Sequence, residues 1–152
     1  MMYEDVVADF AKRTKANLAA IDRLRNEGHE VFEATQLVNS TLGLLVFPQQ
    51  SYVAKIPKIP LAKLERLGWP VPEVEPSFTQ AADLRQLVRY LRNAIAHFNI
   101  EFEGDGTDHI RLLRVWNKDR NNIVTWEATL SVSDLRGIAD KFVELLQDRS
   151  TW

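Results

Sequence analysis

Cysteine is absent from this chain of 152 residues, which excludes disulfides, thiolate metal sites and a cysteine nucleophile. Long apolar runs are absent too, because the longest, residues 42–47, is too short to cross a bilayer. The acidic N-terminal sequence MMYED lacks the apolar core of a signal peptide, and the sequence contains no glycine-rich phosphate loop. These absences predict a soluble, cytoplasmic protein with no membrane partner and no cofactor.

A large net charge is also missing. The 19 Lys and Arg residues nearly balance the 21 Asp and Glu residues, which leaves a formal net charge of −2. Because this charge gives no global attraction to polyanions, any contact with nucleic acid must rest on a local patch. A length of 152 residues with 45% apolar residues suits one core, so we expect residues 1–152 to form a single domain.

Proline is confined to one stretch, because all six prolines fall within residues 48–76. Before it, apolar residues recur with a helical period and predict helices over about 3–27 and 30–45. We expect Gly28 to end the first of them in the left-handed conformation. The proline-containing stretch itself predicts a long ordered loop, interrupted by one or two helical turns at 61–67.

The second half of the chain begins with a third predicted helix, from Ser77 or Thr79 to about Ala96. Its start is predicted by Ser77-x-x-Gln80, which has the form of a capping box. Strand-like runs then alternate with turn residues, which predicts a two- or three-stranded meander over about 98–102, 110–116 and 123–130.

A final helix is predicted after the meander, capped by Ser131 or Ser133 and ending near Gln147. The expected fold class is therefore mainly α. We expect an antiparallel bundle of about four helices, with a small antiparallel β-hairpin or meander before the last helix.

The residue types that carry chemistry lie at the end of the third predicted helix, in the string Arg92-Asn93-Ala94-Ile95-Ala96-His97. Imidazole has an ordinary pKa of about 6.5, so it can exchange a proton with a ribose 2′-hydroxyl or a leaving oxygen. A guanidinium group stays charged and can grip two phosphate oxygens, and Asn93 can hold the imidazole or contact a phosphate. RNA supplies its own nucleophile, so this chemistry requires no metal and leaves a 2′,3′-cyclic phosphate. The competing interpretation is an ordinary helix surface.

Helical geometry limits how these side chains can cooperate. On a wheel of about 100° per residue, Arg92 and His97 lie about 140° apart, and both lie away from the core stripe. Asn93 and His97 are four residues apart and can touch. A straight helix therefore does not direct Arg92 and His97 at one phosphate. Either the helix end is distorted, or a two-fold homodimer pools the residues of two copies.

Other polar groups have two interpretations each. Arg85 and Arg89 either extend a phosphate-binding track towards Arg92 or form a solvent-exposed face. A polar series on the second helix is more simply a solvated or dimer-facing surface than a substrate contact; it consists of Glu33, Gln36 and Asn39. Basic residues of the meander, with two tryptophans, either bind single-stranded RNA or pack onto the bundle, and packing is favoured; they are Arg111, Arg114, Lys118 and Arg120, with Trp116 and Trp126. His29 and His109 have no carboxylate at metal-ligand spacing, so we expect no metal site.

The string Arg92-Asn93-x-x-x-His97, at the end of a late helix in a small helical protein, resembles the motif of the HEPN superfamily. Members of that superfamily carry Arg-x(4–6)-His, usually with Asn, Asp or His directly after the Arg. The segment FEATQLVNS that begins at Phe32, continued by LLVFP ending at Pro48, is similar to a HEPN-family nuclease group of bacterial plasmids. The resemblance implies a metal-independent ribonuclease with a site composed across a dimer, serving in toxin–antitoxin or other defence systems.

Carried over by position, this resemblance implies that Arg92 and His97 are catalytic and that Asn93 supports them. It implies RNA as substrate, a second copy of the chain as partner, and an antitoxin protein as a further partner. One position departs from the pattern, because many HEPN toxins have Tyr two residues after the His, where this chain has Asn99. The alternative function is a HEPN-like binding module that holds RNA, a nucleotide or a protein without cleaving.

Overall fold

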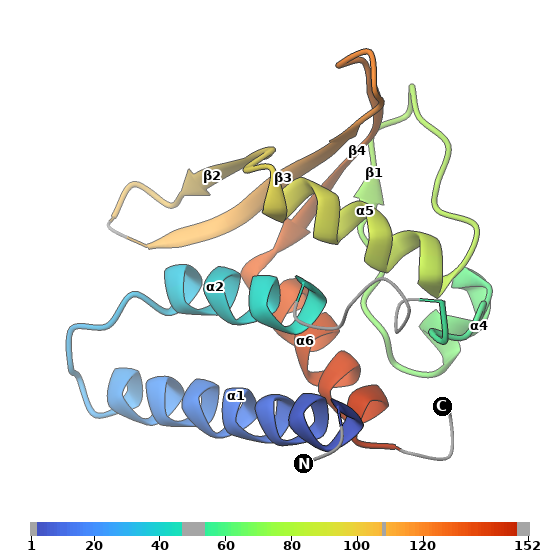
Figure 1. Ribbon diagram of the computed structural model, residues 1–152. Coiled ribbons are helices and arrows are strands. Elements are labelled where there is room, and N and C mark those ends of the chain that lie inside the picture. The colour runs from blue at the N-terminus through green and yellow to red at the C-terminus, as the bar shows by residue number, and fades with distance from the viewer. Residues whose placement is uncertain (1–2, 47–53, 108, 149–152) are drawn as a thin grey trace.

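The computed structural model describes residues 3–46, 54–107 and 109–148, which contain five helices and a four-stranded sheet (Figure 1). The helices are α1 (Tyr3–Asn26), α2 (Glu33–Val46), α4 (Leu61–Arg66), α5 (Leu84–Ala96) and α6 (Val132–Gln147). The strands are β1 (Glu73–Val74), β2 (Ile100–Gly104), β3 (Ile110–Lys118) and β4 (Val124–Ser131). The predicted fold class, mainly helical with an antiparallel sheet before the last helix, is confirmed.

The molecule is layered, with helices on one face of the sheet (Figure 1). The strands are antiparallel in the order β1-β4-β3-β2. Helix α5 packs between β3 and α2, and α1 packs on α2 and α6. Burial alternates along β3 and β4, which is expected when one face of a sheet lies on the core and the other meets water. Within the described residues, no helix is long and apolar enough to span a membrane.

Glycine ends α1 as predicted. Gly28 has a φ of 83°, and the amide of His29 donates to the carbonyl of Leu24 at 3.0 Å. Together these features form a Schellman motif. At the start of α6, Ser131 and Asp134 form a reciprocal capping box, so the prediction of Ser131 as the cap is confirmed and the alternative, Ser133, is wrong.

The predicted start of α5 is wrong. The helix begins at Leu84, because the carboxylate of Asp83 caps it by accepting from the amide of Gln86 at 2.9 Å. The side chain of Gln80 is used elsewhere, since it donates to the carbonyl of Pro72 at 3.0 Å. The cap proposed at Ser77 therefore does not form, and Asp83-x-x-Gln86 takes the role at the same spacing.

The predicted strands need two corrections. The first begins at Ile100 rather than Phe98, because Phe98 belongs to the turn that ends α5. The proline-containing stretch also holds β1, which was predicted as loop and pairs with β4 through Glu73 and Val74. Pro48, which cannot continue a helix and is expected to end the second one, lies within residues 47–53, outside the described residues.

Trp126 anchors α5 to the sheet. Its side chain is 0% exposed, and its ring lies 5.1 Å from that of Tyr90 on α5. The favoured interpretation of this tryptophan, packing of the meander on the bundle, is therefore confirmed. Its indole Nε1 is buried without a hydrogen-bond partner among the described residues.

Candidate functional site

The predicted catalytic string ends α5 in a defined turn. Helical geometry stops at Ala96, and His97 is the C-cap with φ −96° and ψ 6°. The amide of Asn99 donates to the carbonyl of Ala94 at 2.7 Å, and that of Phe98 donates to Ile95 at 3.1 Å. These two bonds are those of a Schellman motif. The amide of His97 still donates to the carbonyl of Asn93 at 3.0 Å, so the chain leaves the helical path at Phe98.

The left-handed position of this motif is occupied by Phe98, with a φ of 55°. Helices α1 and α4 end in the same kind of turn with glycine there, at Gly28 and Gly68. An L-residue with a side chain costs about 1–2 kcal/mol in this conformation. Burial does not offset that cost, because Phe98 is 72% exposed. The backbone beside His97 is therefore strained.

Asn93 connects α5 to the sheet. Its Nδ2 donates to Oδ1 of Asn117 on β3 at 3.2 Å, and Nδ2 of Asn117 donates to Oγ1 of Thr125 at 3.0 Å. Asn117 is only 8% exposed. On the same helical wheel, Asn93 falls about 180° from the core stripe and is expected to face away from the core. That side of α5 is instead covered by β3. Asn93 is therefore a half-buried link rather than part of an open surface.

A polar hollow of about 380 Å³ lies beside His97. Its lining comes from the end of α5, the start of β2 and the turn between β3 and β4: Asn93, His97, Asn99, Asn117, Lys118, Asp119 and Asn122. The side chain of His97 is exposed and makes no hydrogen bond or ion pair with another described residue. The structure thus brings Asn93 and His97 to one hollow, and Arg92 does not line it.

The three arginines of α5 differ in their surroundings. Arg92 is half-buried and Arg89 is exposed, and neither pairs with another described residue. Arg85 is committed to the fold, because its Nε donates to the carbonyl of Ile56 at 2.7 Å. Helix α5 contains no acidic residue. It is therefore a locally basic element in a chain of net charge −2.

The outer face of the sheet does not form a basic patch around Trp116. Arg114 lies 5.6 Å from the Trp116 ring centroid, and it also pairs with Glu101 and Glu127 at 2.6 and 3.1 Å. The hydrogen bond to Glu101 is the main cause that raises the pKa of Arg114. Because both carboxylates compete for this guanidinium, the face is poorly suited to a phosphate backbone.

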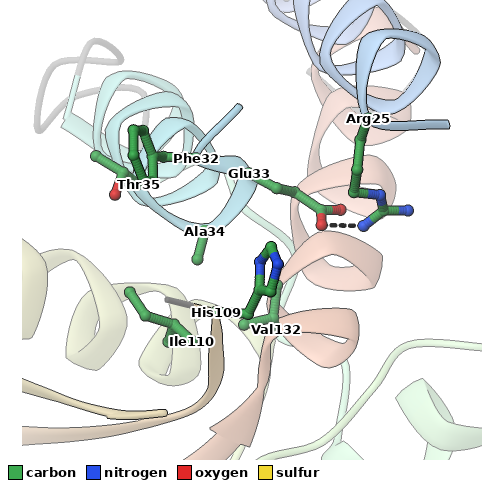
Figure 2. Close-up of a pocket in the computed structure, with 8 residues that line it drawn as sticks. All are labelled: Arg25, Phe32, Glu33, Ala34, Thr35, His109, Ile110 and Val132. Carbon is green, nitrogen blue, oxygen red and sulfur yellow. Dashed lines mark hydrogen bonds and ion pairs between the residues drawn. The ribbon is translucent and has the colours of Figure 1, made fainter. Parts of the chain in front are cut away.

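A second hollow, of about 300 Å³, opens elsewhere between the end of α1, the start of α2, β3 and α6 (Figure 2). Its lining includes Phe32, Thr35 and His109, and its charged pair is Arg25 with Glu33. Sequence reasoning missed this hollow, since its residues come from three segments far apart in the sequence, 25–35, 109–110 and 132. In the part of the chain that the structure describes, no group of three His, Asp or Glu side chains could hold a metal ion.

The sequence as a whole matches the model of one protein family. The model of the family described as HEPN pEK499 p136 matches residues 1–151. The chain therefore belongs to this family and is a member of the HEPN superfamily, which confirms the resemblance drawn from Arg92, Asn93 and His97. No curated protein and no solved structure matches the chain.

Proposed function

We propose that this protein is a metal-independent endoribonuclease in which Arg92 and His97 are catalytic and Asn93 supports them. The observation that carries the proposal is the position of His97. Its imidazole is exposed beside a polar hollow and is not held by another described residue. An imidazole in such a place can take the proton of a ribose 2′-hydroxyl while the 2′-oxygen attacks phosphorus. The bond between phosphorus and the 5′-oxygen then breaks, the 5′-oxygen takes a proton from the imidazolium just formed or from water, and a 2′,3′-cyclic phosphate remains.

Arg92 supplies the positive charge that this reaction needs. Its guanidinium pairs with no other described residue, so its donors are available to the phosphate oxygens. Charge grows on those oxygens in the transition state, and a fixed cation stabilises it. Arg89 extends the basic surface of α5 along the RNA backbone. Arg85 lies one turn earlier on the helix, where its hydrogen bond to the carbonyl of Ile56 holds its guanidinium in place.

The site is completed by a second copy of the chain in this proposal. Support comes from the lining of the hollow, which contains His97 but lacks Arg92. A two-fold axis beside α5 would let Arg92 of one protomer reach the hollow of its partner. Membership of the HEPN superfamily, whose members are generally ribonucleases, supports the activity. A role as a toxin or defence ribonuclease, with an antitoxin protein as partner, is a further part of this proposal.

The test is cleavage of single-stranded RNA by the purified wild-type protein in excess EDTA. We expect fragments that end in a 2′,3′-cyclic phosphate and a 5′-hydroxyl, and light scattering that reports a dimer. Cleavage that requires added Mg²⁺, or fragments with a 3′-hydroxyl, would contradict the mechanism. RNA binding without cleavage would instead identify a HEPN-like binding module, and a monomer that cleaves would exclude the shared site.

A further inference from the structure

The end of α5 carries an aromatic side chain that the packing of the protein does not use. Phe98 is 72% exposed and makes no ring contact with another described residue. It also holds a left-handed conformation in which α1 and α4 have glycine. A phenylalanine there contributes neither burial nor favourable backbone geometry, and strained residues of this kind cluster at functional sites. A binding role accounts for both features.

The neighbours of Phe98 indicate what it binds. His97 is followed, after Phe98, by Asn99, which lines the hollow together with Asn122, and neither amide side chain bonds another described residue. Amide side chains offer both donors and acceptors, which suits them to the edges of unpaired bases. Lys118 adds a cation. The carboxylate of Asp119 is already engaged, since it accepts from the backbone amides of Asn121 and Ile123 at 2.8 and 3.0 Å.

We propose that Phe98 stacks on the RNA base adjoining the phosphate that is cleaved, and so holds that nucleotide against the hollow beside His97. This inference rests on the ribonuclease function proposed above and names a further substrate-binding residue for it. Every base has a π-face, so an exposed ring binds single strands with little dependence on sequence. The hydrogen-bonded turn fixes the backbone of Phe98 directly after His97, so a base stacked on the ring would lie close to the imidazole.

The test uses a short, mixed-sequence single-stranded RNA with a 2′-O-methyl group on every ribose, which cannot be cleaved because its nucleophile is blocked. Its Kd is measured by fluorescence anisotropy at one salt concentration. We expect Phe98→Leu to weaken binding about tenfold, because the flat ring is lost. Phe98→Trp keeps a stacking ring and should stay within about twofold of the wild type. Phe32→Leu is the matched control, because Phe32 is 61% exposed and lines the hollow between α1, α2, β3 and α6. The Kd of this variant for the RNA should equal that of the wild type.

The variant Phe98→Gly separates the effect of backbone strain on stability from the effect of the ring on RNA binding. Phe98→Gly is expected to raise the melting temperature, because glycine fits the left-handed position. The same variant should weaken binding as much as Phe98→Leu. A purely structural residue would not show gain of stability together with loss of binding.

Three results would overturn the inference. The first is a wild-type protein that does not bind the methylated RNA. The second is an unchanged Kd for Phe98→Leu. The third is dissociation of the dimer by Phe98→Leu, because the ring would then be a contact between two copies of the chain. The two proposals fail separately. Binding that depends on Phe98, without cleavage of unmodified RNA, would refute only the ribonuclease. Cleavage that depends on His97, with Kd and KM unaffected by Phe98→Leu, would refute only the stacking.

Discussion

The variant His97→Ala is expected to cleave RNA about a hundredfold to ten-thousandfold more slowly than the wild type, the range that a positioned general acid or base contributes. In the proposed mechanism, the imidazole exchanges protons with the reacting oxygens. Because His97 is exposed, its loss should change the free energy of unfolding by less than about 0.5 kcal/mol. Initial cleavage rates and chemical denaturation of the same preparations measure both quantities.

The chain contains matched controls for this variant. Its other two histidines, His29 and His109, are also exposed and lie outside the hollow beside His97. His29→Ala and His109→Ala should therefore cleave at the wild-type rate. Persistent cleavage by His97→Ala, or an equal loss in either control, would remove His97 from the chemistry.

The core variant Trp126→Ala is expected to lower the free energy of unfolding by about 3–5 kcal/mol. Its side chain is 0% exposed and packs against Tyr90, so the substitution leaves a cavity between α5 and the sheet. Denaturant unfolding followed by circular dichroism measures the loss. Since α5 and its C-cap carry Arg92, Asn93 and His97, cleavage should fall in proportion to the unfolded fraction.

The variant Trp126→Phe separates the contribution of aromatic packing to stability from the contribution of the indole Nε1. The indole Nε1 has no hydrogen-bond partner among the described residues, so removing it relieves an unpaired buried donor. We therefore expect Trp126→Phe to cost much less than Trp126→Ala. Equal losses in the two variants would mean that Nε1 makes a bond essential to the fold.

Local signals explain which parts of the fold were predictable. A 3.6-residue period identified α1, α2 and α6, and Gly28 ends α1 because glycine adopts a positive φ without steric cost. The start of α5 was missed because two sequences with capping spacing compete, and only the tertiary contact of Gln80 with Pro72 decides between them. Strand β1 has two residues, which is too short for any period to appear.

The candidate site was predictable in its residue types but not in its arrangement. Chemistry, spacing and family resemblance proposed Arg92, Asn93 and His97, of which Asn93 and His97 line the hollow. Asn117 was not, because it lies 24 residues from Asn93 and only the packing of α5 on β3 brings the amides together. Phe98 was predicted to lie in a strand, since an aromatic residue is rarely expected in a left-handed turn.

Mixed dimers test whether two protomers build one site. Arg92→Ala and His97→Ala chains are co-expressed with different affinity tags, and the mixed dimer is purified through both tags. Each variant alone should be inactive. The mixed dimer should recover about half of the wild-type rate, because one of its two sites then has an intact Arg92 from one protomer and an intact His97 from its partner. A mixed dimer as inactive as either parent would contradict the shared site and would place Arg92 and His97 of the same chain together in catalysis.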